Sequence, residues 1–291
     1  MQSDFSLTLC ICTRNRADDL RRCLESVHGS TRMPEQVIVS DDGDDGKTVE
    51  ALAASFPFVQ YQRGPRIGLG ANRNACIAIS TGRYIAFIDD DVTIPATYVQ
   101  TACDLIQQHA NASPMPILGG IEYKHTSAGT ILIEPGNADF WGFQRVPPNG
   151  VYRSMVINAA IFPATLFAAA LFDSQLRYGS EEIDMARHAI ALGYTIVFDR
   201  SLQVDHYPSE INRAEYAALI DASRMYATAK AYWCYQKQPV KAIVFSILAP
   251  IKLSIALGRR RGLVGLKSSL TATTTAFRYA RRAMEIGRAH V

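Results

Sequence analysis

The chain contains 291 residues, with a formal net charge of +3, 48% hydrophobic residues and 20% charged residues. This balance is typical of a globular protein, and it excludes a disordered, collagen-like or coiled-coil chain. A chain of this length forms one or two domains and needs no disulfide bonds to fold. Its charge is uneven, because residues 211–291 contain 14 Lys or Arg residues against 3 acidic residues.

The six cysteines are scattered, and none forms a C-x-x-C pair. This usage predicts reduced thiols and a cytoplasmic location. The short, polar start of the chain, Met1–Phe5, gives no reason to expect a secretory segment. Cys10 and Cys12 stand two apart in an apolar run, so we expect them to share one face of a core strand.

The first 110 residues alternate between strand-like and helix-like segments. The hydrophobic pattern predicts strands over 6–13, 36–40, 59–62 and 83–88, and helices over 17–28, 49–55, 69–80 and 96–109. Pro95 is expected in the first turn of the last of these helices. This alternation predicts an α/β fold with a parallel sheet covered by helices on both faces.

Beyond residue 110 the pattern becomes richer in strands and then helical. We expect strands over 116–123, 130–133, 151–157 and 194–204, a helix that starts at Pro163, and a helix over 181–192. Residues 211–291 are expected to form helices with one apolar and one basic face.

Polar clusters follow three of the predicted strands. They are Thr13–Arg16, Asp41–Gly43 and Asp89–Asp91. Ligands of such sheets bind beyond the carboxyl ends of the strands, so the three clusters predict one nucleotide-type site. Three consecutive carboxylates repel one another unless a cation neutralises them, and a divalent ion that bridges to a pyrophosphate would do so. A solvated acidic turn that caps a helix is the alternative.

Four motifs occur in an order that resembles family 2 glycosyltransferases of the GT-A fold. They are LTLCICTRNR at Leu7–Arg16, VIVSDDG at Val37–Gly43, the segment Gly68–Asp91 that ends in DDD, and YGSEEIDMARHAIALG at Tyr178–Gly193. The resemblance covers residues 5–207 and implies an inverting transfer of a sugar from a nucleotide-diphosphate donor, assisted by Mn²⁺ or Mg²⁺. It divides the chain into a catalytic domain over 1–210, with a nucleotide-binding half (1–110) and an acceptor half (111–210), and a helical region over 211–291.

The resemblance also assigns roles to individual residues. Asp41 or Asp42 would contact the nucleotide base, Arg73 would approach the base or the phosphates, and Asp89 would lie near the ribose or the metal. Asp91 would be the direct metal ligand, with His206 either completing the metal shell or serving a structural role. Thr13, Asn15, Arg16 and Asp90 complete the expected donor-binding set.

The catalytic base falls on the acidic pair Glu181-Glu182, where the family usually has Glu-Asp. Alignment through Asp184 places Glu182 on the family's catalytic aspartate, with Glu181 or Asp184 as the fallback. The ordinary alternative is that acids are favoured in the first turn of any helix.

The apolar stretch Ala242–Leu257 is interrupted by Pro250 and Lys252, and Lys241 and Arg259–Arg261 flank it. This pattern favours a helix that lies in an anionic membrane interface over one that spans the membrane. The alternative is a core helix with a solvated basic face. The last residues, Glu285–Val291, can be back-translated into the start of a common sequencing adapter, so we hypothesise that the native sequence differs after Met284.

The sequence therefore predicts a glycosyltransferase of cell-surface glycan synthesis, peripheral to the inner face of the cytoplasmic membrane. Its expected partners are a nucleotide-diphosphate sugar (UDP favoured), a glycan or lipid-linked acceptor, and an anionic membrane surface, but no nucleic acid. The alternatives are a sugar nucleotidyltransferase and a non-catalytic membrane scaffold. Residues Thr13–Arg16 do not supply the Gly-rich, Lys-containing loop that a nucleotidyltransferase favours.

Overall fold

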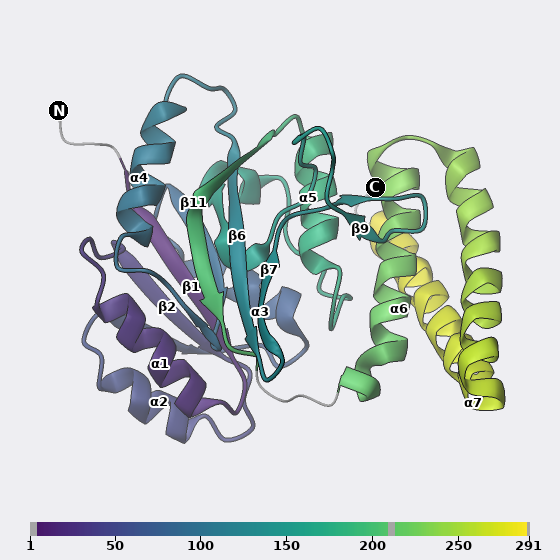
Figure 1. Ribbon diagram of the computed structural model, residues 1–291, viewed down its shortest axis with the longest axis horizontal. Coiled ribbons are helices and arrows are strands. Elements are labelled where there is room, and N and C mark those ends of the chain that lie inside the picture. Colours follow the sequence, from purple (N-terminus) through teal and green to yellow (C-terminus); the bar gives the residue numbers. More distant parts are fainter. Residues whose placement is uncertain (1–4, 209–212, 290–291) are drawn as a thin grey trace.

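The computed structural model describes residues 5–208 and 213–289, and it places an α/β layer structure beside a group of long helices (Figure 1). The strands are β1 (Leu7–Thr13), β2 (Gln36–Asp41), β3 (Val59–Arg63), β4 (Tyr84–Asp89), β5 (Val92–Thr93), β6 (Ile117–Thr126), β7 (Gly129–Ile133), β8 (Asn137–Ala138), β9 (Gln144–Arg145), β10 (Ala160–Pro163) and β11 (Ile196–His206). The α-helices are α1 (Ala17–His28), α2 (Lys47–Ala54), α3 (Leu69–Ile79), α4 (Tyr98–Gln108), α5 (Glu181–Ala191), α6 (Arg213–Lys230) and α7 (Pro239–Ala289).

The central sheet is mixed, and its strand order is β3-β2-β1-β4-β10-β6-β11-β5, with β7 paired to β6. Strands β1 to β4 are parallel, as predicted for residues 1–110. The insertion of β10 antiparallel between β4 and β6 makes the sheet mixed. The predicted α/β class is confirmed.

Alternate side chains of β1 point to opposite faces of the sheet and contribute to the core layer on each face. Leu7, Leu9 and Ile11 pack with α1, α2 and α4, whereas Cys10 and Cys12 pack with α3 and α5 on the other face. Residues two apart in a strand share a face, so one short run serves two helical layers. The expectation that Cys10 and Cys12 lie together in the core is confirmed, because both are buried free cysteines.

Three local predictions are wrong. Residues 151–157 form no strand; they lead to a 3₁₀ turn at Ile157–Ala159, where Asn158 turns inward to bond Asp89 and Glu122. Pro163 ends β10 and precedes a 3₁₀ turn at Ala164–Ala168 rather than an α-helix. Pro95 lies before α4, and its carbonyl accepts the amide of Tyr98.

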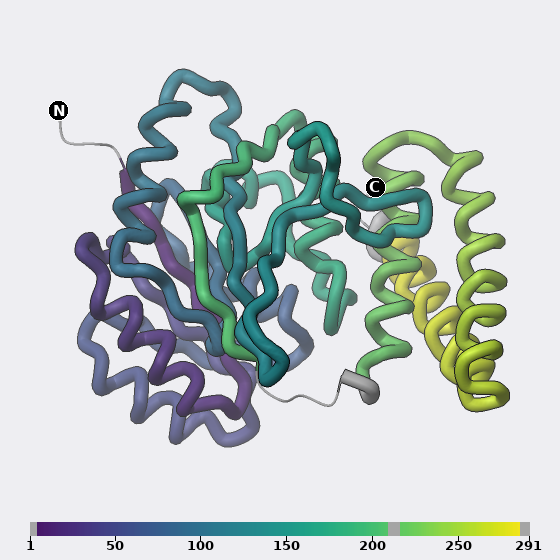
Figure 2. Tube along the Cα trace, viewed as in Figure 1, coloured from purple at the N-terminus to yellow at the C-terminus, as the bar shows by residue number. Residues whose placement is uncertain are grey.

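The C-terminal region is helical, as predicted. A π-helical turn, η3 (Ala231–Tyr235), follows α6, and α7 is two helical segments that meet at Gly262, whose φ of 56° is non-helical. The chain folds back there, so the two segments lie side by side (Figure 2), and the Ser254 and Ser269 hydroxyls are 3.0 Å apart. Residues 290–291 of the suspected non-native tail lie outside the described residues.

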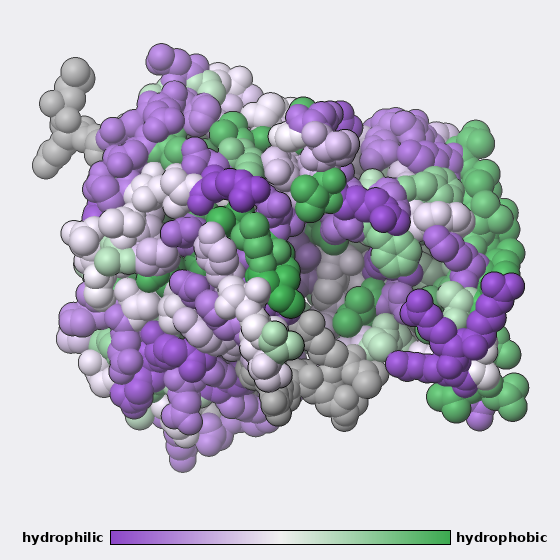
Figure 3. All heavy atoms as spheres, in the orientation of Figure 1, coloured by the Kyte–Doolittle hydropathy of each residue, from purple (hydrophilic) through white to green (hydrophobic). Residues whose placement is uncertain are grey.

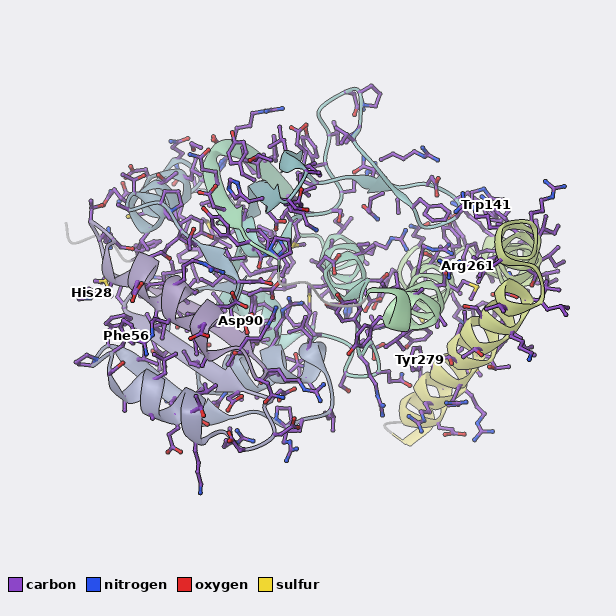
Figure 4. The ribbon with its side chains drawn as sticks, turned by 60° about the horizontal axis from the view of Figure 1, so that its bottom comes forward. His28, Phe56, Asp90, Trp141, Arg261 and Tyr279 are labelled. Atoms are coloured by element: carbon purple, nitrogen blue, oxygen red, sulfur yellow. The ribbon has the colours of Figure 1, made fainter. Side chains whose placement is uncertain are left out.

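The helical region packs on the β8–β9 segment through its own apolar cluster. Phe140 and Trp141 contact this cluster, which includes Tyr232 and Phe245. The ammonium of Lys252 lies 3.9 Å from the ring centroid of Trp141, and Figure 4 shows Trp141 next to the helices. The helices are therefore joined to the α/β part by direct side-chain contacts.

Candidate active site

The register of the parallel strands brings the predicted clusters to one edge of the sheet. Thr13 pairs with Asp41 of β2, and Cys12 pairs with Asp89 of β4, so the last residues of three strands are neighbours. This edge is the carboxyl end, where ligands of open α/β sheets bind. The geometry therefore collects polar side chains from distant parts of the sequence at one position.

Asp90 is the most buried member of the triple aspartate, and Figure 4 shows it in the interior of the α/β part. Its carboxylate accepts the Thr13 hydroxyl at 2.7 Å and pairs with Arg16 at 2.5 Å, and Arg16 also reaches Asp91 at 2.8 Å. Burial raises the pKa of Asp90 to about 7, although Arg16 opposes the shift. Thr13 at the end of β1 and Arg16 just before α1 thus hold the triple aspartate in place.

Asp91 meets His206 from the end of β11. The Asp91 Oδ1 and His206 Nε2 atoms are 3.3 Å apart, and His206 Nδ1 lies 2.6 Å from Glu122 Oε1. Burial lowers the pKa of His206, but hydrogen bonds with Asp91 and Glu122 outweigh it and raise the pKa to about 9. Glu122 on β6 therefore fixes the orientation of the imidazole.

This donor set fits a divalent cation. A metal-binding histidine commonly gives its second ring nitrogen to a carboxylate, as His206 does to Glu122. The residues that the structure describes contain no group of three or more such side chains arranged around a metal position. Further ligands would therefore come from diphosphate oxygens and water, as Mg²⁺ prefers.

The segment Asp41–Gly43, at the end of β2, forms the neighbouring part of the same sheet edge. Asp41 is fully buried, and its carboxylate accepts the Gly43 amide at 2.7 Å and the Arg63 guanidinium at 2.6 Å. Asp42 is partly exposed and accepts the Arg66 amide at 2.9 Å. Of the two residues predicted to contact a base, Asp42 is thus the more accessible.

Asn15 connects the β1–α1 loop to this region. Its side chain both donates to and accepts from Asp44, at 2.7 Å and 2.9 Å. Its φ of 57° is left-handed, a conformation that asparagine tolerates better than most residues. Asn15 therefore joins the two loops that border the site.

Arg73 joins two acidic residues, Asp89 and Glu181, that are 92 positions apart in the sequence. Its guanidinium is 3.3 Å from Asp89 and 3.5 Å from Glu181, and it lies over the Phe172 ring. Only 2% of the Arg73 residue surface is exposed. A buried guanidinium between two carboxylates holds the triple aspartate next to the start of α5.

The three acidic residues at the start of α5 have different surroundings. Glu181 pairs with Arg73, and Asp184 pairs with Lys230 at 2.8 Å. The Glu182 carboxylate accepts a hydrogen bond from its own backbone amide, and within residues 5–208 and 213–289 it forms no ion pair with a basic side chain. Burial and the neighbouring charge of Glu181 raise the pKa of Glu182 to about 7. This carboxylate is suited to accept a proton near neutral pH.

Sequence reasoning missed Glu122, Asn158 and Lys230. Asn158 accepts the Asp89 amide at 2.9 Å and donates to Glu122 at 3.0 Å, which links the two halves of the site. A signal was present for Glu122, since it is a lone acid after the apolar run Ile117–Ile121. Lys230 lies in a helix whose basic residues look alike in sequence, so nothing distinguished it.

Comparison with known families agrees with this architecture. Residues 8–141 match the model of glycosyl transferase family 2. The mixed sheet with helices on both faces is that of the GT-A fold. Residues 8–141 are therefore similar to a family 2 glycosyltransferase domain.

Several curated relatives carry glycosyltransferase or glycan-synthesis names. The chain is 33% identical over 102 residues to the "Uncharacterized glycosyltransferase YibD" of Escherichia coli, which covers 34% of this chain and 30% of that protein. It is 26% identical over 218 residues to the "Succinoglycan biosynthesis protein ExoM" of Rhizobium meliloti, and this match covers 72% of this chain and 69% of that protein. It is 26% identical over 99 residues to the "Amylovoran biosynthesis glycosyltransferase AmsE" of Erwinia amylovora, and this match covers 32% of this chain and 37% of that protein.

Proposed function

We propose that the protein is a metal-dependent, inverting glycosyltransferase that uses a nucleotide-diphosphate sugar, with UDP as the favoured carrier, to build a cell-surface glycan. The observation that carries this proposal is the convergence of Asp91, His206 and Arg73 with the acidic start of α5 at one sheet edge. The names of ExoM and AmsE support a role in polysaccharide synthesis.

In the proposed reaction, an acceptor hydroxyl attacks the anomeric carbon while the bond to the donor phosphate breaks. Glu182 accepts the hydroxyl proton, and the nucleoside diphosphate leaves with the bonding electron pair. Arg73 stays charged between its carboxylate partners and would offset the negative charge of the departing phosphates. Asp91 and His206 would hold Mn²⁺ or Mg²⁺, which supplies positive charge against the leaving diphosphate.

The location we propose is the inner face of the cytoplasmic membrane. Among the described residues, Pro239–Glu285, which includes both segments of α7, contains an 18-residue stretch with the apolar composition of a membrane span, and 22% of that stretch is buried. The outer α7 face consists of seven exposed residues: Val240, Ile243, Val244, Ile247, Leu248, Ile251 and Ile255. Their spacing places them on one side, and Figure 3 shows a hydrophobic band along that edge of the molecule.

The opposite side of the same segment packs against protein. Ala242, Phe245, Ala249 and Leu253 are buried in the helical cluster. A helix that spanned a bilayer alone would have to leave these contacts, so we propose that it lies in the interface plane. Arg259, Arg260 and Arg261 are exposed at its end and would attract anionic lipid.

The proposed activity is tested by the release of nucleoside diphosphate. Purified protein is incubated with UDP-, dTDP- or GDP-sugars, with lipid extract as acceptor source, and with Mn²⁺ or EDTA. We expect release from one class of donor, dependent on both metal and extract. The Glu182→Gln protein is expected to give no release. Absence of release from every donor, in folded protein, would contradict the proposal.

A further inference from the structure

Lys230 is the last residue of α6, outside the region that matches the glycosyltransferase family. Its ammonium lies 2.7 Å from Asp173 Oδ2 and 2.8 Å from Asp184 Oδ2. All three side chains are largely buried, with 19%, 12% and 4% of their surfaces exposed. One cation therefore bridges two carboxylates that come from different segments of the catalytic domain.

Each carboxylate of the bridge has a second partner from the helical region. The Tyr226 hydroxyl donates to Asp173 at 2.7 Å, and the Tyr235 hydroxyl donates to Asp184 at 3.2 Å. Burial lowers the pKa of Lys230, but Asp184, Tyr235 and Asp173 outweigh it and raise the pKa, so the ammonium stays charged. The polar groups of this buried network satisfy one another, as a stable buried network requires.

The two ends of the bridge lead directly to the candidate active site. Asp184 lies in the first turn of α5, two residues after Glu182. Asp173 follows Phe172, whose ring lies under the Arg73 guanidinium and whose backbone amide and carbonyl both bond Asn74, at 2.9 Å and 2.8 Å. Lys230 of α6 thus sets the distance between the start of α5 and Phe172, which lies beside Arg73.

We propose that Lys230 is a positioning residue, which fixes Glu182 relative to Arg73 and so makes the C-terminal helices part of the catalytic unit. The inference rests on the proposed function. Without the ammonium, two buried carboxylates would repel each other and the first turn of α5 would move away from Phe172. A displacement of about 1 Å at a catalytic group can cost about 100-fold in rate.

The test compares Lys230→Met with Lys237→Met, a matched control. Lys237 is exposed, lies seven residues further along the chain in the turn before α7, and has no assigned role in the site. With the donor that the wild type uses, Lys230→Met is expected to lower kcat about 100-fold and to change the donor KM less than about threefold. Lys237→Met is expected to keep the wild-type kcat. Both are assayed well below their melting temperatures.

Rescue separates positioning from a general loss of stability. Arginine can reach both carboxylates with separate N–H groups, so Lys230→Arg is expected to recover at least about tenfold of the lost kcat. If Lys230→Met fails to fold, Lys230→Met/Asp184→Asn removes one of the two unpaired charges and their mutual repulsion, and its kcat is expected to stay low. A kcat within threefold of wild type in folded Lys230→Met, or in folded Lys230→Met/Asp184→Asn, would overturn the inference. Inactive wild-type protein would instead count against the proposed function.

Discussion

At the residue scale, the proposed chemistry depends on the different partners of the acidic residues at the start of α5. Glu181 and Asp184 are each engaged by a basic side chain, Arg73 and Lys230. Glu182 is the remaining acid, and its surroundings raise its pKa. A carboxyl group with this pKa is neutral below about pH 7 and charged above it, so it can act as a base only above about pH 7.

We therefore expect the transfer rate to rise with pH and to level off above about 7, the pKa of Glu182. Below that value, the rate should fall tenfold per pH unit, because only the deprotonated carboxylate can accept the proton. Initial rates between pH 5.5 and 8.5, at saturating donor, measure this. A rate that is flat across the range would contradict the assignment of Glu182.

Replacement of Glu182 by Gln should reduce kcat by at least about 100-fold and leave donor binding intact. Because the folded-state pKa is raised above 4.5, this carboxyl lowers stability as pH rises from that value through about 7. The Gln variant should therefore melt at an equal or higher temperature than wild type at pH 8. Wild-type turnover would exclude Glu182 as the base, and a lower melting temperature would contradict its environment.

At the element scale, the core between β1 and α1 depends on side chains that the sequence pattern identified. Leu24 is fully buried on α1 in the cluster with Leu9 and Ile11. Leu24→Ala should lower the free energy of unfolding by about 2–5 kcal/mol, through lost burial and the cavity left behind. The adjacent exposed Glu25 provides a control, and Glu25→Ala should stay within about 0.5 kcal/mol of wild type in urea unfolding.

The outer α7 face makes a second prediction at this scale. Ile247 lies in its middle with 58% of its surface exposed, and Ile247→Glu should weaken binding to vesicles that contain phosphatidylserine by at least about tenfold. Flotation measures the bound fraction. Ala51→Glu, on the exposed side of α2, adds the same charge far from this face and should bind like wild type.

Two further outcomes of that experiment bear on the orientation of α7. Binding should fall with salt, because Arg259–Arg261 contribute through charge. Carbonate at high pH should extract the protein from vesicles, since a helix in the interface plane is not anchored across the bilayer. Resistance to carbonate would support a spanning helix, and equal binding of Ile247→Glu would contradict docking by this face.

At the scale of the whole molecule, the sequence predicted the elements that repeat a regular pattern. Helix α1 begins and ends where its apolar spacing indicated, at Ala17 and His28. Two of the three errors lie at 151–168, where the chain leaves regular structure so that Asn158 can bridge Asp89 and Glu122. Such a bridge depends on a tertiary contact between strands, which local periodicity does not encode.

For the candidate site, too, the sequence predicted some features and missed others. Motifs placed Asp89, Asp91, His206 and Glu182 in one region, and the fold brings Asp91 and His206 into contact. The sequence did not predict that Thr13 and Arg16 would hold Asp90, nor that Lys230 would bridge Asp173 and Asp184. These contacts form between segments 46 to 77 residues apart, and they become visible only once the sheet and helices are assembled.

The most direct test of the account is whether a nucleotide sugar and a metal bind together through Asp91. Thermal unfolding is followed for wild type and Asp91→Asn with UDP-, dTDP- and GDP-sugars, each with and without Mn²⁺. Ligands that bind the native state raise the melting temperature in a concentration-dependent way. We predict a metal-dependent rise for one nucleotide class in wild type, and its loss in Asp91→Asn. No rise with any donor, or an equal rise in both proteins, would contradict the proposed metal-assisted donor site.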